Sequence, residues 1–230
     1  AYGEHGAIVH YSADEKSNVP LKEGKLFMTD TGGHYLEGST DITRTVALGE
    51  VGNTEKEHFT LVARAMLRLA NTVFLYGCSG ANLDCIAREV FWKEGLNFNH
   101  GTGHGVGYLL NIHEGPINFR WKEGERPAPA LEENMVITDE PGIYIEGSHG
   151  IRLENELLVR KTVKNEYGQF MNFEILTYVP IDLDAILPEK MSTEEKEMLN
   201  HYHKQVYEKV SPYLSEEERI WLKEYTRAVK

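Results

Sequence analysis

Alternating apolar and polar residues predict β-structure near the start of the chain. Residues 6–12 alternate in this way, while KLFMTD at 25–30 and the run at 40–48 are rich in β-forming residues. The stretch GGHYLEGS between the last two segments has the composition of a turn. These two strands are therefore expected to form a hairpin.

Two helices are expected after the hairpin. Apolar residues recur at helical spacing from residue 54 up to Gly77, and Thr54 with Glu57 forms a capping-box sequence at the start. A second helix is expected from about 82 to 94, ending at Gly95. The segment 99–107 carries four glycines and two histidines, so it is predicted to be a functional loop rather than a regular element.

The second half of the chain is expected to begin with a surface loop and to continue with strands. Residues 120–129 are polar and contain proline, as surface loops do. Three β segments follow, namely MVITDEP, the stretch around IRLENELLV, and residues 173–179.

The tail from Ser192 is predicted to be helical, with an interruption at Pro212. Because strands and helices follow one another without regular βα alternation, the pattern favours an α+β fold. Capping-box sequences start the two tail helices at Ser192 with Glu195 and at Ser215 with Glu218.

Composition is typical of a folded, soluble enzyme. Hydrophobic residues make up 41% and charged residues 26%, and no apolar run approaches the roughly 20 residues that span a bilayer. The net charge of -12 argues against nucleic acid or an acidic membrane surface as a partner. Cys78 and Cys85 are expected on one face of a helix as reduced thiols, which suits a cytoplasmic location.

Five ionisable residues stand where the pattern predicts buried β-structure. One unpaired buried carboxylate costs several kcal/mol, so such residues need solvent or a cation. Asp30 ends KLFMTD, Asp41 opens DITRTVAL, Glu140 closes NMVITDE, Glu154 lies within IRLENELLV, and His104 stands in GTGHGVG.

Three arrangements would satisfy these side chains. They can face solvent in half-exposed strands, pair with Arg44, Arg152 or a lysine, or jointly ligate divalent metal. Four carboxylates and one histidine suit Mn²⁺, Co²⁺ or Zn²⁺ and exceed what one ion needs, so two ions sharing bridging carboxylates would use them all.

Spacing supports such a cluster. Asp30 and Asp41 are expected to face each other across the hairpin. Arg152, Glu154 and Glu156 are expected to share one face of a single strand, because side chains of a strand repeat every second residue. These residues alone indicate a dinuclear site but no substrate.

At these residues the chain resembles the catalytic domain of the pita-bread metallopeptidases, which include methionine aminopeptidase, prolidase, aminopeptidase P and creatinase. The resemblance is an ordered Asp, Asp, His, Glu, Glu set carried by TDTGGHYLEGSTDITRT, HGTGHGVG, DEPGIY and RLENELLV. It implies an α+β fold with a mixed, curved β-sheet flanked by helices. It also implies a catalytic domain at 1–180 and a helical C-terminal extension at 181–230 that packs on it.

Within this family the chain is similar to the Xaa-Pro aminopeptidases of the three-domain kind, through HGTGHGVGYLLNIHEGP and the ending NFEILTYVPIDLDAIL. Thr31 departs from the Ser or Ala common at that position. The resemblance implies a cytoplasmic enzyme that releases the first residue of peptides whose second residue is proline. It implies two N-terminal domains that are missing from this chain, with any substrate-binding residues they contribute, and it allows a homodimer.

The resemblance also implies a mechanism. A water or hydroxide bridging two divalent ions, most readily Mn²⁺ with Co²⁺ or Zn²⁺ as alternatives, would attack the carbonyl before proline. Asp30 would chelate one ion, Asp41 and Glu154 would bridge both, and His104 and Glu140 would complete the set. Glu140 would also carry the proton from the nucleophile to the leaving nitrogen.

Four further residues receive roles from the resemblance. His113 is expected to donate to the oxyanion, His100 to hold substrate or relay protons, and His10 to line the proline pocket. Arg152 is expected to fix a bridging carboxylate by charge-assisted hydrogen bonds. The alternative for each histidine is a structural hydrogen bond.

Other functions fit the same resemblance. A prolidase would cleave Xaa-Pro dipeptides, and a non-catalytic pita-bread domain would bind partners. The second kind loses metal ligands, whereas all five match here. An enzyme domain that is silent without its N-terminal domains is a third alternative.

Overall fold

The computed structural model describes residues 1–109, 111–122 and 127–230. Strands β1 (Lys25–His34) and β2 (Ser39–Leu48) pair antiparallel along their whole length, which confirms the predicted hairpin. Leu26 and Met28 of β1 are buried on the same face, as the two-residue period of a strand requires.

The segment before β1 is not the predicted strand. Residues Gly3–Ala7 form a short 3-10 helix. It packs closely against the later chain, because a Cβ placed on Gly6 would lie 2.9 Å from the backbone nitrogen of Gly150. Contact between two glycine backbones thus overrides the local alternation of this segment.

The main sheet has the strand order β3-β10-β9-β6-β4-β5, and β7 pairs with β8 in a separate hairpin. Among the described residues every pairing of named strands is antiparallel, so the expected mixed sheet is corrected to an antiparallel one. The strands are β3 (Phe74–Leu75), β4 (Gly103–Val106), β5 (His113–Phe119), β6 (Val136–Asp139), β7 (Gly142–Ile145), β8 (His149–Arg152), β9 (Asn155–Asn165) and β10 (Gly168–Ile175).

Strand β4 occupies the glycine-rich segment that was predicted to be a loop. Its glycines serve close packing rather than flexibility, because a Cβ on Gly103 would overlap the Thr138 carbonyl oxygen and one on Gly105 would overlap that of Glu114. At these two positions of β4, between β6 and β5, only glycine fits. The surface loop predicted at 120–129 falls partly outside the described residues.

The two predicted helices are present with shifted ends. Helix α1 (Asn53–Ala70) starts after Gly52 without the predicted capping box and stops before Gly77, since Phe74 and its neighbour pair with β10 instead. Helix α2 (Gly80–Lys93) carries a capping box between Ser79 and Asn82.

The two cysteines do not share a helix face. Cys78 precedes the N-cap of α2, and Cys85 lies within that helix. Both are free thiols, as expected.

The tail is helical as predicted. Helix α3 (Thr193–Val210) and helix α4 (Glu216–Tyr225) both start with the predicted capping boxes, and a 3-10 turn at Ser211–Tyr213 separates them at Pro212. Two more 3-10 turns, Leu183–Ala185 and Pro188–Lys190, lead into the tail.

Side chains of α3 join the tail to the body of the molecule. The Tyr202 hydroxyl lies 2.8 Å from Nη2 of Arg44, and Nε2 of His203 accepts a hydrogen bond from the Ile181 backbone at 3.1 Å. These contacts are those expected of an extension packed on the same domain, and the domain boundary stays a prediction.

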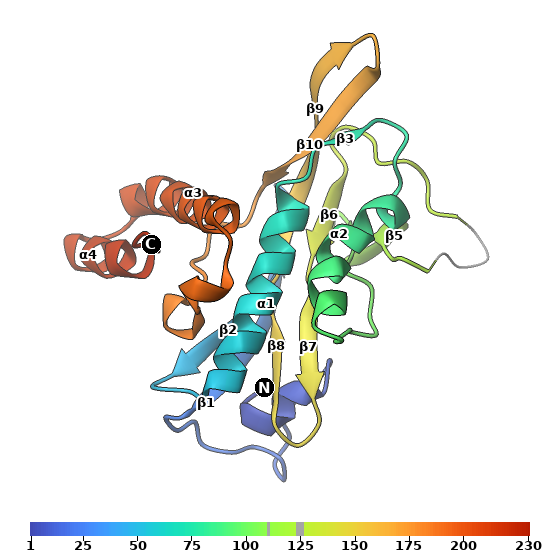
Figure 1. Ribbon diagram of the computed structural model, residues 1–230. Coiled ribbons are helices and arrows are strands. Elements are labelled where there is room, and N and C mark those ends of the chain that lie inside the picture. Colours follow the sequence, from blue (N-terminus) through green and yellow to red (C-terminus); the bar gives the residue numbers. More distant parts are fainter. Residues whose placement is uncertain (110, 123–126) are drawn as a thin grey trace.

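Figure 1 shows α1 and α2 covering the sheet, while α3 and α4 lie to one side and the β9–β10 hairpin projects from the body. The core lies between α1 and the sheet, where Phe59, Met66, Ile137 and Leu157 have no exposed surface. Each such side chain stabilises the fold by about 1.5–3 kcal/mol relative to exposure. Among the described residues no helix is both long and apolar enough to span a membrane.

Candidate metal centre

Hairpin β1–β2 brings the two predicted aspartate ligands to one face. Asp30 is paired with Thr43, and Asp41 is paired with Gly32. Since Thr43 and Asp41 are two residues apart, Asp30 and Asp41 are diagonal neighbours with side chains on the same face. The two carboxylates face each other across the hairpin as expected, with ligand atoms within 4.8 Å of each other.

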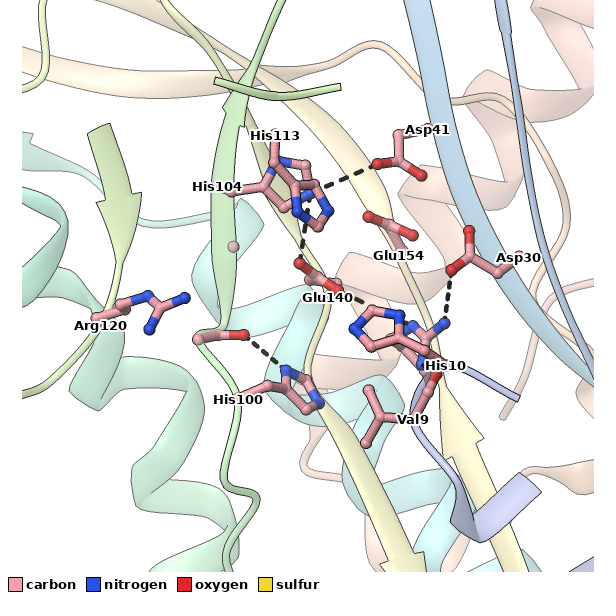
Figure 2. Close-up of a pocket in the computed structure, with 13 residues that line it drawn as sticks. Val9, His10, Asp30, Asp41, His100, His104, His113, Arg120, Glu140 and Glu154 are labelled. Carbon is pink, nitrogen blue, oxygen red and sulfur yellow. Dashed lines mark hydrogen bonds and ion pairs between the residues drawn. The ribbon is translucent and has the colours of Figure 1, made fainter. Parts of the chain in front are cut away.

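The other three predicted ligands come from the main sheet and its connection to β8. His104 lies in β4, Glu140 follows β6, and Glu154 lies between β8 and β9. Nε2 of His104 is 3.5 Å from Oδ2 of Asp41 and 3.6 Å from Oε1 of Glu140. Figure 2 shows all five predicted ligands around one cavity of about 130 Å³.

The ligand atoms fall into two overlapping groups. His104, Glu140 and Glu154 offer atoms that all lie within 4.8 Å of one another, and so do Asp30, Asp41 and Glu154. Because Glu154 belongs to both groups, the arrangement has the composition of two neighbouring ion sites with a shared carboxylate. This donor set, mostly oxygen with one imidazole, fits two divalent cations.

The hydrogen bond made by the other ring nitrogen of His104 prepares it for a cation. Nδ1 lies 3.0 Å from the Gly105 carbonyl oxygen, which can only accept, so Nδ1 carries the proton. Nε2 faces the carboxylates of Asp41 and Glu140. Burial lowers the pKa of His104, but the hydrogen bond to Asp41, the Gly105 carbonyl and the nearby carboxylates raise it overall, so without a cation Nε2 is the place for a proton. A bound cation would take the place of that proton. A neutral imidazole in this tautomer is the form that ligates metal.

The carboxylates repel one another in a site with little solvent. Burial raises the pKa of Glu140 to about 7, with the nearby carboxylates of Asp41 and Asp30 adding to the effect. Burial also raises the pKa of Glu154, which is 2% exposed, and Glu140 and Asp41 raise it further. A site that disfavours negative charge in this way is stabilised by bound cations.

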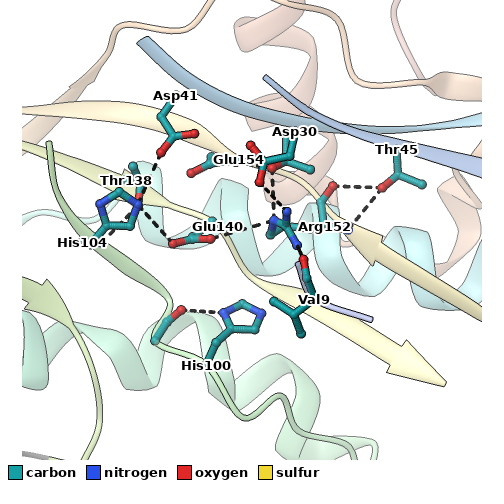
Figure 3. Close-up of polar contacts among 12 residues, drawn as sticks. Val9, Asp30, Asp41, Thr45, His100, His104, Thr138, Glu140, Arg152 and Glu154 are labelled. Carbon is teal, nitrogen blue, oxygen red and sulfur yellow. Dashed lines mark hydrogen bonds and ion pairs between the residues drawn. The ribbon is translucent and has the colours of Figure 1, made fainter. Parts of the chain in front are cut away.

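Arg152 is buried beside the cluster, but it does not hold the carboxylate that was expected. Its Nη2 donates to Oδ2 of Asp30 at 2.7 Å, and its Nε donates to the Thr43 hydroxyl at 3.1 Å (Figure 3). Glu154 instead accepts a hydrogen bond of 2.7 Å from that same hydroxyl. Arg152 thus fixes Asp30 directly and the shared carboxylate only through Thr43.

Glu156 does not have the position that its spacing predicted. Strand β8 ends at Arg152 and β9 begins at Asn155, so Arg152, Glu154 and Glu156 do not share one strand face. Oε1 of Glu156 accepts a hydrogen bond of 2.8 Å from the backbone N–H of Asp41. Glu156 therefore supports the backbone that carries a predicted ligand.

The three additional histidines all line the cavity. The His113 ring lies with its centroid 3.9 Å from that of His104, and burial lowers its pKa, with His104 as the next cause. Nε2 of His100 lies 2.9 Å from the Tyr144 hydroxyl. His10 lies beside Val9 at the edge of the cavity near Arg152 (Figure 2).

The sequence did not single out three residues of the site. Arg120 and Val9 line the cavity, and Tyr144 adjoins it. Tyr144 lies in β7 and bonds both His100 and Arg152, and its position two residues after Gly142 in DEPGIY was the available signal. Arg120 and Val9 line the cavity from segments with no chemical pattern around them. Only the folded chain brings these segments together.

A pita-bread fold that gathers four carboxylates and a histidine in one cavity is the architecture of a metallopeptidase. A model described as metallopeptidase family M24 matches residues 1–161, and one for the C-terminal region of that peptidase matches residues 169–229. The chain therefore belongs to metallopeptidase family M24.

Curated relatives match almost the whole chain. A probable Xaa-Pro aminopeptidase P of Paracoccidioides brasiliensis is 39% identical over 232 residues, and Aminopeptidase P1 of Arabidopsis thaliana is 38% identical over 230 residues. Each alignment covers 99% of this chain but only 38% and 36% of the relative, respectively. The chain thus spans little more than a third of the relatives that it matches.

Solved structures agree with this assignment. The chain is similar to X-prolyl aminopeptidase from Caenorhabditis elegans, described as a cytosolic enzyme with a di-nuclear active site, at a TM-score of 0.93 and 36% identity over 100% of this chain and 38% of that one. It is similar to Xaa-Pro dipeptidase from Bacillus anthracis at a TM-score of 0.63 and 34% identity over 80% of this chain and 46% of that one. The predicted pita-bread fold is confirmed.

Proposed function

We propose that the protein is a cytoplasmic Xaa-Pro aminopeptidase, which removes the first residue of peptides that have proline in the second position. The observation that carries this proposal is the likeness to the C. elegans X-prolyl aminopeptidase across the entire chain. The B. anthracis dipeptidase aligns with a smaller part and a lower TM-score. This difference favours the aminopeptidase over the dipeptidase.

Two divalent cations, with Mn²⁺ as first choice and Co²⁺ or Zn²⁺ as alternatives, are the proposed cofactors. Asp30, Asp41 and Glu154 would hold one, and His104, Glu140 and Glu154 would hold the other, in the two groups that share Glu154. When bound, such ions acidify water enough to supply a nucleophile near neutral pH. The predominance of carboxylate oxygen favours Mn²⁺ over softer ions.

Glu140 is the proposed proton carrier. Its carboxylate lies in the ligand group, with Oε1 3.6 Å from Nε2 of His104, so it would stand within reach of a water held there, as a group that accepts and then releases a proton requires. The Thr138 hydroxyl lies 3.4 Å from Oε1 and orients this carboxylate. Glu140 would take a proton from the attacking water and give it to the proline nitrogen that leaves.

His113 and His10 are proposed to contact the peptide. His113 stands at the more exposed side of the ligand cluster, and a lowered pKa keeps its ring neutral near pH 7 with one N–H to donate. That N–H would stabilise the oxyanion that develops on the scissile carbonyl. His10, next to Val9, would line the pocket for the proline ring.

A comparison of two peptides tests the activity. The protein at its natural full length, loaded with Mn²⁺, is incubated with Arg-Pro-Pro and with the dipeptide Arg-Pro, and release of free arginine is measured. An aminopeptidase releases arginine from Arg-Pro-Pro much faster, and a chelator abolishes this. Faster cleavage of the dipeptide would replace the proposal with a prolidase activity.

A further inference from the structure

One buried arginine holds the segment that carries His100. Residues 97–100 connect α2 to the strand β4, and Arg88 of α2 donates to three acceptors in this segment. Its Nη1 lies 3.1 Å from Oδ1 of Asn97 and 2.7 Å from the Phe98 carbonyl oxygen. Its Nη2 lies 2.7 Å from the carbonyl oxygen of His100 itself.

The guanidinium of Arg88 is fixed from the other side by Asp84, one helical turn earlier. Arg88 is 1% exposed and Asp84 is fully buried, and Nε of the arginine donates to Oδ2 of the aspartate. An exposed pair at this spacing adds only about 0.3–0.5 kcal/mol to a helix. Here the remaining donors all point out of the helix to the connecting segment, so stabilising α2 does not account for them.

Ring contacts through Phe98 also connect Arg88 to the imidazole of His100. The guanidinium carbon of Arg88 lies 4.0 Å from the centroid of the Phe98 ring, and that ring lies 5.0 Å from the ring of His100. The backbone and the packing face of His100 are therefore both set by residues that touch Arg88.

The imidazole of His100 is then held in one tautomer. Nδ1 lies 2.7 Å from the Gly101 carbonyl oxygen and must donate to it, which leaves Nε2 as an acceptor for the Tyr144 hydroxyl at 2.9 Å. The Tyr144 oxygen in turn accepts from Nη1 of Arg152 at 3.1 Å. With a neutral His100, every donor in this chain of hydrogen bonds meets an acceptor.

We propose that Arg88 is a positioning residue, which holds the backbone and ring of His100 so that its Nε2 meets Tyr144 at the wall of the active site. The proposal rests on the aminopeptidase function for its kinetic consequences, but not for the geometry. Burial lowers the pKa of His100 to about 4, and the charges of Arg152 and Arg88 add to this, in agreement with a neutral ring.

Two substitutions separate the effect of the hydrogen bonds that Arg88 donates from the effect of its positive charge. Arg88→Lys keeps the positive charge beside Asp84 but cannot reach three acceptors with one planar fork. Arg88→Met keeps the length and removes the charge. In the full-length enzyme we expect both to lower kcat about 10- to 100-fold with KM within about two-fold, because small displacements of active-site groups have effects of this size.

The pH profile distinguishes the two variants. Removing a positive charge near His100 favours its protonated form, so the pKa of His100, about 4 in the wild type and followed through its ring ¹⁵N signals, should be higher in Arg88→Met and unchanged in Arg88→Lys. Arg64→Met is the matched control, because it breaks a partly buried ion pair between α1 and Glu195 of α3 and should change neither quantity. Equal losses of kcat in Arg64→Met and Arg88→Lys would overturn the proposal.

A spectroscopic measurement tests the geometry without any activity. In the Zn²⁺-loaded, ¹⁵N-histidine-labelled protein, the ring signals assigned through His100→Asn should show the Nδ1–H tautomer in wild type and in Arg64→Met. They should lose this single tautomer in Arg88→Lys, which is expected to fold even if Arg88→Met does not. An unchanged tautomer in Arg88→Lys contradicts the proposal, whether or not the wild type cleaves Xaa-Pro peptides.

Discussion

Oδ2 of Asp30 accepts a hydrogen bond of 2.7 Å from Nη2 of Arg152, and this ion pair joins the hairpin β1–β2 to the end of strand β8. Asp30 is 45% exposed in its side chain, whereas Arg152 is 3% exposed, so the buried partner orients the more exposed one. The ion pair therefore sets one of the two groups of proposed ligands before any cation binds.

The first prediction concerns this ion pair. Arg152→Met should weaken binding of one cation about 10- to 100-fold, the usual effect of removing a residue that orients a ligand, and titration calorimetry with Mn²⁺ on the metal-free protein measures it. Arg160→Met is the control, because Arg160 pairs with Glu174 on the surface far along the β9–β10 hairpin. Equal affinities in both variants would show that Asp30 is oriented by the backbone alone.

The second prediction tests the shared carboxylate. Glu154→Gln should give a folded protein that binds fewer than two ions per chain, because a neutral amide replaces the charge common to both groups. Elemental analysis after dialysis gives the stoichiometry. Glu156→Gln provides the matched control, since its amide oxygen can still accept from the Asp41 N–H and two ions should remain. Two ions retained at wild-type affinity in Glu154→Gln would exclude a bridging role.

The third prediction separates His113 from the ligands. Its nitrogen lies in a third group with Asp41 and His104, so the geometry alone permits metal binding. If His113 donates to the oxyanion, His113→Ala should keep two ions and lower kcat by about 10² to 10³. A variant that loses an ion would make His113 a ligand, and an unchanged rate would leave it a structural role.

The fourth prediction follows from the raised pKa of Glu140. A carboxyl whose folded pKa exceeds its unfolded value stabilises the fold below the unfolded pKa, near 4.5, and this stability is lost as pH rises through the folded value of about 7. Both proteins are compared without metal. From pH 5 to pH 8, the urea concentration at which the wild type unfolds should therefore fall by more than that of the Glu140→Gln variant.

One control completes this comparison. Saturating divalent cation should remove the difference between pH 5 and pH 8 in the wild type, because the ions favour the ionised carboxylates. If the stability of the wild type and of Glu140→Gln changed by the same amount between pH 5 and pH 8, Glu140 would not set the pH dependence.

Local patterns predicted the elements whose periodicity and caps agree with their environment. The hairpin of β1 and β2, helix α2 and both tail helices follow from alternation, helical spacing and capping boxes. The failures lie where tertiary contacts override local preference. The glycines of β4 predicted a loop, but they are needed because the Thr138 carbonyl occupies the space of a side chain at Gly103.

The candidate site divides in the same way. Charge within or at the ends of apolar strand segments marked the four carboxylates, because carboxylates in such places need an explanation. His104 stood out through the glycine-rich segment GTGHGVG. The sequence did not indicate that Arg88 and Tyr144 belong to the site, because an arginine in a helix is usually solvated and a tyrosine in a strand usually packs in the core. Their roles depend on contacts between segments far apart in the sequence.

The proposed ligands stand on β1, β2 and β4 and just after β6 and β8, so neither ligand group can form from one local piece of chain. Closing such long-range pairings is slow compared with forming a helix. Ion capture should thus come late in folding and only on a nearly complete sheet. Once bound, the ions would stabilise the finished fold by mass action, by an amount that grows with the logarithm of the ratio of their concentration to the dissociation constant.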